Sequence, residues 1–328
     1  MKTFRTLTRL PSLALSAAAL TLCADAALAQ YPDRPVRIVV GFSPGGPTDV
    51  VARAFAAYAA QAMGQSFVVE NKPGANTILA AEAVAKAAPD GYTLLVGATN
   101  HTMIPALYSS RVKFDALRSF TPVCAVAVSP TVLVVGPALP VKTLDAFLAK
   151  VRAEPGRITY ATPGTGSSGH FATAQFLNLT KTSMNHIPYK GASQAIADLL
   201  GGQVDSSLAT LGSVLPQVES GKLTALAVAA PQRLPQLPQV PTFDEAGVHG
   251  YTADAWYGVL APAGLPQDVR SKLEQVARDF ARAPATAKSL DALGMQASQT
   301  CGNDFNAQLA SEIDANRKLA ENLGLKAD

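Results

Sequence analysis

The chain has 328 residues, of which 48% are hydrophobic and 6% aromatic, and its formal net charge is +3. The basic residues are dispersed and no stripe of Lys and Arg accompanies stacking aromatics, which argues against a nucleic-acid partner. The length exceeds the size at which one hydrophobic core usually keeps growing, so two domains are expected.

The first 29 residues follow the plan of a secretory signal peptide. Lys2, Arg5 and Arg9 make a basic start, an apolar stretch covers 13–22, and small residues end the segment at 27–29. The leader contributes three bases and one acid, so a net charge of +1 remains on the rest. No later run reaches about 18 uninterrupted apolar residues. We therefore predict cleavage after residue 29 and export.

The three cysteines give little reason to expect disulfides. Cys23 lies in the predicted leader, and a lipoprotein alternative is disfavoured because Leu22 stands where a lipid-attachment motif needs a small residue. Cys124 and Cys301 remain, which is too few for a disulfide framework. They could form one bridge in an oxidising compartment, but we expect two separate buried thiols.

Short β-rich runs alternate with Ala-rich helical stretches, which predicts an α/β architecture with largely parallel, buried sheets. The first series comprises strand 36–41, helix 49–63, strand 66–70, helix 78–87 and strand 92–96, followed by strand candidates at 123–128 and 131–135. The second series comprises helix 143–153, strand 157–161, helix 170–180, strand 184–189, helix 193–200 and strand 203–209.

Four prolines keep the segment 231–242 from pairing as a central strand, so we interpret it as a surface crossing. Beyond it we predict strand 255–261 and helices near 267–282, 284–293 and 303–323. This C-terminal set of helices is expected to pack back onto the first domain.

The run from Val36 to Asp49 is a β-rich segment that breaks into glycines and restarts as a helix. Gly45 and Gly46 let the backbone approach a ligand closely, and the following helix directs unpaired N–H groups and its positive dipole end toward the loop. This pattern predicts an anion cradle, although an ordinary strand-to-helix turn has the same pattern.

A second Gly-rich loop, 164–169, satisfies G-x-G-x-x-G between a strand and a helix, as a dinucleotide site requires. Such a site also needs an acidic residue about 20 residues further on to hold the ribose. The segment 184–190 contains no carboxylate. Nucleotide binding is therefore the weaker interpretation of this loop.

Ser167, Ser168 and His170 lie together and suggest an exported serine hydrolase as an alternative. The elbow G-x-S-x-G is absent because His170 stands where its last glycine would be. Hydroxyls and amides in a Gly-rich turn also serve as neutral donors to a carboxylate, which is the interpretation we favour. The four histidines fall at no metal-binding spacing, so neither a metal nor another cofactor is predicted.

Two further pairs of residues follow predicted strands. Thr99 and Asn100 come after the strand ending at Gly97, and Ala209 and Thr210 stand at the end of the strand 203–209. The carboxyl edge of an open α/β sheet is where ligands bind, so both pairs are candidates for the site. Solvent-exposed turns are an equally good interpretation of each residue taken singly.

Taken in order, the motifs resemble those of the Bug family, the periplasmic solute-binding proteins of tripartite tricarboxylate transporters. The resemblance covers nearly the whole chain after the leader. It rests on YPDRPVR at 31–37, FSPGGPTD at 42–49, VVENKPGA at 68–75, PDGYTLL at 89–95, HIPYKG at 186–191, GGQVD at 201–205, VPTFDEAG at 240–247, WYG at 256–258 and APAG at 261–264.

The resemblance implies a two-domain periplasmic-binding-protein fold of the Venus-flytrap, type II-like kind, with the ligand cleft between the domains. By analogy the crossovers lie near 123–135 and 250–262, which divides the chain into domain 1, at 30–128 and 254–328, and domain 2, at 129–253. Many relatives have an Asp at the position of Ala209 and a Trp at that of Asn316. The family's ligands vary widely, so the acid itself is left open.

We therefore predict a periplasmic receptor without catalytic activity, monomeric, that captures a small organic carboxylate and delivers it to the membrane permease subunits of a tripartite transporter. Asp49 is expected to orient loop amides or waters and to leave the carboxylate to neutral donors. The predicted site residues are Phe42, Ser43, Gly45, Gly46, Thr48, Asp49, Thr99, Asn100, Gly164, Gly166, Ser167, Ser168, His170, Ala209 and Thr210.

Overall fold

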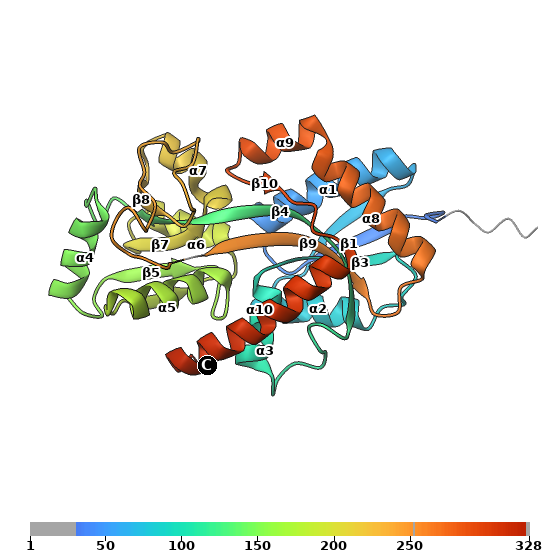
Figure 1. Ribbon diagram of the computed structural model, residues 1–328, viewed down its shortest axis with the longest axis horizontal. Coiled ribbons are helices and arrows are strands. Elements are labelled where there is room, and N and C mark those ends of the chain that lie inside the picture. Colours follow the sequence, from blue (N-terminus) through green and yellow to red (C-terminus); the bar gives the residue numbers. More distant parts are fainter. Residues whose placement is uncertain (1–30, 252, 326–328) are drawn as a thin grey trace, which may run out of the picture.

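The computed structural model describes residues 31–251 and 253–325, so the predicted signal peptide lies outside the described residues. Ten strands form one curled sheet with the order β2-β1-β3-β9-β4-β7-β5-β6, and β8 and β10 also pair with β4 (Figure 1). The strands are β1 (Val36–Val40), β2 (Phe67–Asn71), β3 (Thr93–Ala98), β4 (Phe120–Val135), β5 (Thr159–Thr162), β6 (Asn185–Pro188), β7 (Ser206–Thr210), β8 (Thr224–Val228), β9 (Asp254–Pro262) and β10 (Gln296–Ala297).

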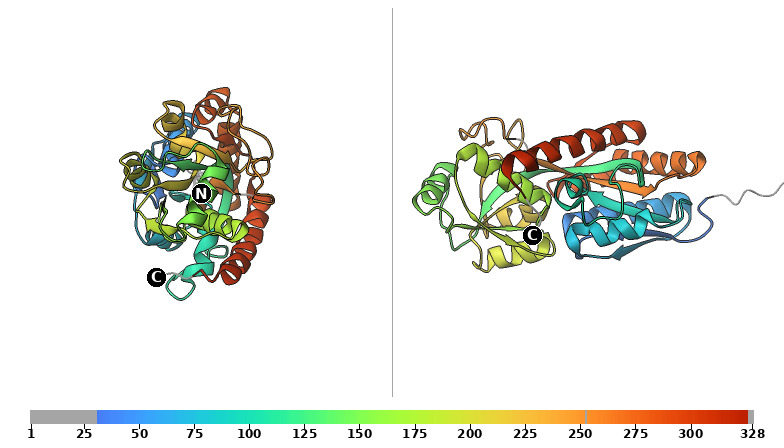
Figure 2. Two further views of the ribbon diagram at one scale, coloured as in Figure 1. Left: turned by 90° about the vertical axis from the view of Figure 1, so that its left-hand side faces the viewer. Right: turned by 90° about the horizontal axis from the view of Figure 1, so that it is seen from below.

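Helices cover the sheet in two groups. They are α1 (Pro47–Met63), α2 (Ile78–Ala85), α3 (Asn100–Tyr108), α4 (Leu144–Ala153), α5 (Ser168–Thr180), α6 (Ala192–Leu200), α7 (Leu211–Glu219), α8 (Gln267–Arg282), α9 (Pro284–Asp291) and α10 (Gly302–Leu323), with a short 3-10 helix η1 (Ala75–Thr77) before α2. We call the half built on β1–β3 with α1–α3 and α8–α10 the first lobe, and the half built on β5–β8 with α4–α7 the second lobe. The two lobes lie side by side along the long axis (Figure 2).

Helix α1 shows how the sequence specifies an element of the first lobe. Pro47 occupies its first turn, where a missing N–H costs nothing, and Gly64 ends it in the left-handed conformation with φ +70°. Val51, Phe55 and Ala59 recur every four residues and are fully buried against the sheet. The glycine loop before α1 is thereby attached to a helix held by the core of the first lobe.

Strands β4 and β9 connect the lobes. They pair antiparallel from Phe120 opposite Pro262 to Pro130 opposite Asp254, and beyond Thr131 strand β4 pairs instead with β7 and β8. Both strands run across the middle of the molecule from one lobe to the other (Figure 1). The predicted domain boundaries at residues 128/129 and 253/254 stay a prediction. The point where β4 changes its pairing from β9 to β7 and β8 lies close to them.

The predicted pair of strands at 123–128 and 131–135 is one strand, β4, which corrects that expectation. Helices α3 and α7 were not predicted from the sequence, because each contains a proline, Pro105 or Pro216, that weakens a helical pattern. Strands β8 and β10 were also missed. The segment 231–242 forms no strand, as predicted, although Leu234 and Leu237 are buried.

Cys124 and Cys301 form a disulfide, which corrects the expectation of two separate thiols. Cys124 lies in β4 and Cys301 directly precedes α10, and an antiparallel bridge between them brings their Cα atoms to 4.0 Å. No sequence pattern announces this pairing, since the two residues are 177 positions apart.

The C-terminal helices pack back onto the first lobe, as predicted. Leu273, Val276 and Phe280 of α8 share one buried cluster with Phe55 of α1, and Phe305 of α10 packs edge to face against Trp256. Of the helices in the described part of the chain, none combines the length and the apolarity needed to cross a membrane.

Candidate functional site

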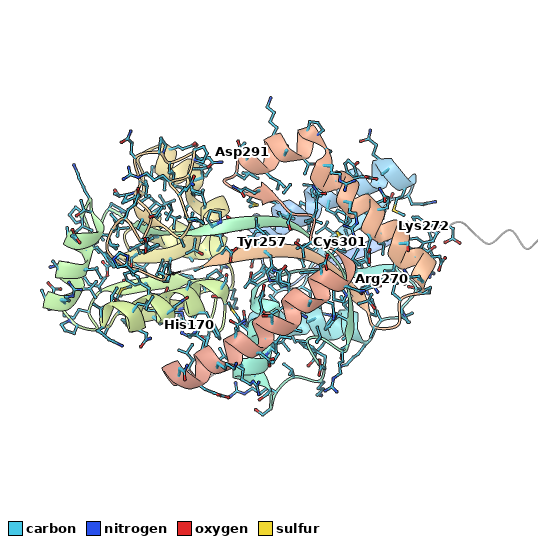
Figure 3. The ribbon with its side chains drawn as sticks, viewed as in Figure 1. His170, Tyr257, Arg270, Lys272, Asp291 and Cys301 are labelled. Carbon is cyan, nitrogen blue, oxygen red and sulfur yellow. A yellow bond between two sulfur atoms is a disulfide. The ribbon has the colours of Figure 1, made fainter. Side chains whose placement is uncertain are left out.

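A cavity lies between the two lobes, over the middle of the sheet. We call it the first compartment. From the first lobe and the connecting strands it is lined by Phe42, Ser43, Gly46, Pro47, Thr48, Ala98, Ala255 and Tyr257, and from the second lobe by Pro163, Ser168, Gly169, Ala192, Ala195, Ile196, Ser207, Leu208, Ala209, Thr210 and Ser213. Tyr257 belongs to β9, at the centre of the molecule (Figure 3).

Four helices begin at this cavity. Helix α1 contributes Gly46 to Thr48, α5 contributes Ser168 and Gly169, α6 contributes Ala192, and α7 contributes Thr210 and Ser213. The N-caps Gly46, Gly191 and Thr210 make no side-chain capping hydrogen bond. Each helix start carries about half a positive charge and unpaired N–H groups. The cavity is therefore electropositive without any cationic side chain.

None of the residues lining the first compartment is charged. Its polar side chains are hydroxyls, from Ser43, Thr48, Ser168, Ser207, Thr210, Ser213 and Tyr257. Burial raises the pKa of Tyr257 to about 12 against the opposing effect of a hydrogen bond with Thr210, so the phenol keeps its proton at neutral pH. The lining thus offers neutral donors to an anion.

The carboxylate of Asp49 holds the first Gly-rich loop in place. This carboxylate is 3% exposed and accepts hydrogen bonds from Gly45 N (3.0 Å), Arg53 Nε (2.9 Å) and Asn71 Nδ2 (2.8 Å). Asn71 Nδ2 also donates to the Phe42 carbonyl at 3.0 Å. Asp49 is not among the residues lining the cavity, and the N–H of Gly45 is engaged within the loop. The network fixes the shape of residues 42–49.

We expect Asp49→Asn to lower the free energy of unfolding by about 1–3 kcal/mol, because an amide nitrogen would face one of these donors. Burial by itself raises the pKa of Asp49, but the hydrogen bonds from Arg53, Gly45 and Asn71 outweigh it and lower the pKa overall. The stabilisation that ionised Asp49 gives the folded protein should be complete above about pH 4. It should be lost as the pH falls through the lowered pKa of Asp49 in the folded state.

Urea unfolding of the native protein and of Asp49→Asn, at a series of pH values from 7 into the acid range, measures the difference in their free energies of unfolding. Asp145→Asn, which changes an exposed acid in the first turn of α4, is the control and should lose less stability, about 0.3–1 kcal/mol at most. A difference for Asp49→Asn that stays constant down to the lowest pH would contradict the assigned role.

The second Gly-rich loop is held by two stacked histidines. The rings of His170 and His186 lie 4.3 Å apart, Gly166 N donates to His170 Nδ1 at 3.1 Å, and His186 Nε2 lies 2.7 Å from Thr162 Oγ1. Ser167 is buried, and its hydroxyl oxygen accepts from the backbone N–H of His170 as the N-cap of α5. Two of the three side chains singled out for a hydrolase, those of Ser167 and His170, thus have structural contacts that shape the start of α5, next to which Figure 3 labels His170.

Of the predicted site residues, the structure brings seven together on the lining: Phe42, Ser43, Gly46, Thr48, Ser168, Ala209 and Thr210. Gly45, Gly166 and Ser167 lie in the two loops, and Asp49 and His170 lie in the first turns of the helices that follow them, but none of the five is on the lining; Gly164 lines a neighbouring cavity. Contact of any of these residues with a ligand stays a prediction.

Thr99 and Asn100 are not among the residues that line the first compartment. Thr99 Oγ1 accepts from the backbone N–H of Trp256 at 2.8 Å, and Asn100 Nδ2 donates to Thr77 Oγ1 at 2.7 Å and to the Asn76 carbonyl at 3.3 Å. Both residues start helix α3, which the sequence did not predict. Their contacts in the structure are structural.

Sequence reasoning missed the start of α6 and the contribution of β9. Gly191 before the predicted helix 193–200 was a signal for a further helix start at the site. Ala192 lines the cavity there, and the neighbouring Ser193 Oγ lies 3.5 Å from the Pro44 carbonyl of the other lobe. No local signal identified Tyr257, because only the sheet order brings β9 beneath both loops.

Both lobes touch around the cavity. Ser43 Oγ donates to the Lys190 carbonyl at 3.3 Å, and Tyr108 Oη donates to the Thr165 carbonyl at 2.9 Å. The first and second Gly-rich loops each contact the opposite lobe. Within the described residues, no group of three or more His, Cys, Asp or Glu side chains is placed to hold a metal ion.

Comparison with known proteins agrees with this architecture. Residues 51–325 match the family described as the tripartite tricarboxylate transporter family receptor. The protein BugT of Bordetella pertussis is 34% identical over 297 residues, which cover 90% of this chain and 91% of BugT.

Solved structures share the two-domain periplasmic-binding-protein fold. The periplasmic binding protein BugD is 31% identical with a TM-score of 0.86, covering 90% of this chain and 100% of that one. Rpa4515 of R. palustris, solved with adipate, is 32% identical with a TM-score of 0.87 over 90% and 100% of the two chains. MatC of Rhodopseudomonas palustris, solved with malate, is 32% identical with a TM-score of 0.84 over 88% and 99%.

Proposed function

Because the chain belongs to the tripartite tricarboxylate transporter family of receptors, we propose that it captures a small organic carboxylate in the first compartment. The observation that carries this proposal is the convergence of four helix starts on a cavity lined only by uncharged residues. An anion there is stabilised by N–H dipoles and hydroxyl donors from both lobes. The adipate and malate complexes of two relatives support the same ligand class.

Neutral donors suffice for such a ligand. Hydrogen bonds to an ionised acceptor are roughly twice as strong as neutral ones, and the hydroxyls of Thr48 and Ser168 lie on the lining together with the helix starts. A buried Arg or Lys would add the cost of its own desolvation. Asp49 stays behind the loop, where its charge is paired with Arg53 and does not repel the ligand.

We propose further that the ligand closes the receptor, as a monomer in the periplasm, and that the closed form delivers the acid to the permease subunits of the transporter. Each lobe supplies part of the lining, so a ligand gains all its contacts only when the lobes meet. Ligand therefore shifts the population toward closure. Export by the predicted leader and the relatives' description as periplasmic support the location.

We assign no catalytic step to the site. Ser167 is 1% exposed and caps α5, and Nδ1 of His170 accepts a backbone N–H. A buried capping hydroxyl is poorly placed to attack a substrate. Turnover of an ester by the native protein that disappears in Ser167→Ala or Ser168→Ala would establish a hydrolase instead.

A thermal unfolding screen against organic acids tests the receptor. A ligand at a hundred times its dissociation constant should stabilise the protein by about 2.7 kcal/mol. The panel should include dicarboxylates and monocarboxylates, with an uncharged sugar and an organic cation as controls. A shift with the sugar or the cation, and none with any acid, would refute the carboxylate assignment.

A further inference from the structure

A second cavity lies beside the first, also between the lobes. We call it the second compartment. It is lined by Asn76, Thr77, Tyr108 and Arg111 of the first lobe and by Gly164, Thr165, Tyr189 and Lys190 of the second, among others. Phe42 and Pro163 line both compartments, one from each lobe. Two residues that line both of two adjacent cavities lie at the boundary between them, and we call this boundary the wall.

The two compartments differ in charge. The first has no charged residue on its lining, whereas the second includes Arg111, Lys190 and Glu82. Glu82 is already engaged, since it pairs with Lys86 at 3.5 Å. The ammonium of Lys190 has no ion-pair partner in the described part of the chain. The second compartment is therefore net cationic.

The second compartment also contains an unpaired amide. Both Asn76 Nδ2 and Asn76 Oδ1 are buried and find no hydrogen-bond partner among the described residues. Asn76 is held in the left-handed region at φ +49°, and its carbonyl accepts from Asn100. The unused Nδ2–H donors suit a carboxylate, whereas Oδ1 can only accept, and the side chain must turn toward the compartment to present them because both atoms are shielded from solvent.

The wall itself is fixed. The Phe42 carbonyl is held by Asn71 Nδ2, which also donates to Asp49, so the backbone that carries the ring is tied to the base of the loop. Pro163 is conformationally rigid and directly follows β5. A ligand that extends from the helix starts toward Lys190 must displace the Phe42 ring.

We propose that Phe42, together with Pro163, sets the length of the acid that this receptor accepts, by separating the neutral first compartment from the cationic second one. The inference rests on the proposed function. Short acids occupy the first compartment alone, whereas longer dicarboxylates lose affinity because their distal end meets the wall. Removing the ring joins the compartments and lets a distal carboxylate reach Asn76 and Lys190.

The test is calorimetric titration of the native protein and Phe42→Ala with succinate, glutarate, adipate, pimelate and suberate. We expect the native protein to prefer the shorter acids. In Phe42→Ala, the affinity for suberate relative to succinate should rise at least about 10-fold, since one methylene misfit in a pocket is worth 10-fold or more. Adding Lys190→Gln to Phe42→Ala should cancel most of that gain.

Phe114→Ala is the matched control, because it removes a half-buried ring of the first lobe that lines neither compartment. Its order of preference should follow the native one, and thermal unfolding of each variant verifies folding. An unchanged order in Phe42→Ala, or a gain that persists without Lys190, would overturn the inference and leave the receptor function intact. Failure of all five dicarboxylates to bind the native protein would overturn the inference alone, whereas failure of every acid in the wider thermal screen would overturn the receptor function as well.

Discussion

Replacing both half-cystines, as Cys124→Ala with Cys301→Ala, should lower the free energy of unfolding by about 2–5 kcal/mol. The disulfide ties β4 to the residue before α10 across 177 positions, so it closes a long loop in the unfolded chain. Loop entropy in the unfolded state grows with loop length, which makes this crosslink effective. Denaturant unfolding of the variant and of the oxidised native protein measures the loss.

Reduced native protein provides the control, since it lacks the crosslink but keeps every side chain and should match the variant. Neither cysteine lines the first compartment, so ligand affinity at temperatures well below unfolding should change little. Equal unfolding midpoints for the oxidised protein and the double variant would show that the crosslink does not stabilise the fold. A double variant that is folded but no longer binds the ligand would contradict the expectation that the disulfide does not influence the binding site.

Ala192→Asp should weaken binding of the acid ligand by roughly three orders of magnitude. Ala192 is the first residue of α6 and lines the first compartment, so an aspartate there places a carboxylate at the start of the helix. Two like charges 4 Å apart interact by about 4 kcal/mol at the effective dielectric constant of a protein surface. Titration calorimetry with the acid identified in the screen measures the effect.

Ala192→Asn is the matched control, because its amide has nearly the same shape and no charge. Its affinity should fall far less than that of the aspartate variant. The aspartate should leave the unliganded protein at least as stable as the native one, since an acid in the first turn interacts favourably with the helix dipole. Equal affinities of Ala192→Asp and Ala192→Asn would show that the added side-chain volume at position 192, and not its charge, weakens ligand binding.

The two Gly-rich loops have different supports. The first is held by one buried carboxylate, Asp49, which gathers donors from the loop, its own helix and β2. The second is held by neutral imidazoles, and burial lowers the pKa of His186 to about 4, with His170 adding to the effect. Charge thus stays behind the loops, and hydroxyls and N–H groups face the cavity. This arrangement suits a site that must bind an anion and release it again.

The sequence by itself determined the local elements and both loops. Alternating β-rich and Ala-rich runs predicted most strands and helices, because apolar periodicity and the glycine or proline at an element's end act over a few residues. The same short-range signals located Ser43, Gly46 and Thr48 at one helix start and Ser168 at another, and these residues do line one cavity. Asp49 was also predicted to support the loop, and its three hydrogen bonds agree with that role.

Only the tertiary structure decided which distant residues meet. The bridge between Cys124 and Cys301, the place of Tyr257 beneath both loops, and the wall formed by Phe42 and Pro163 all depend on the order of strands in the sheet. Thr99 and Asn100 lie outside the lining of the first compartment for the same reason, since β9 and η1 engage their polar groups. Local pattern fixes what a segment becomes, but sheet order is set by packing between segments far apart in the chain.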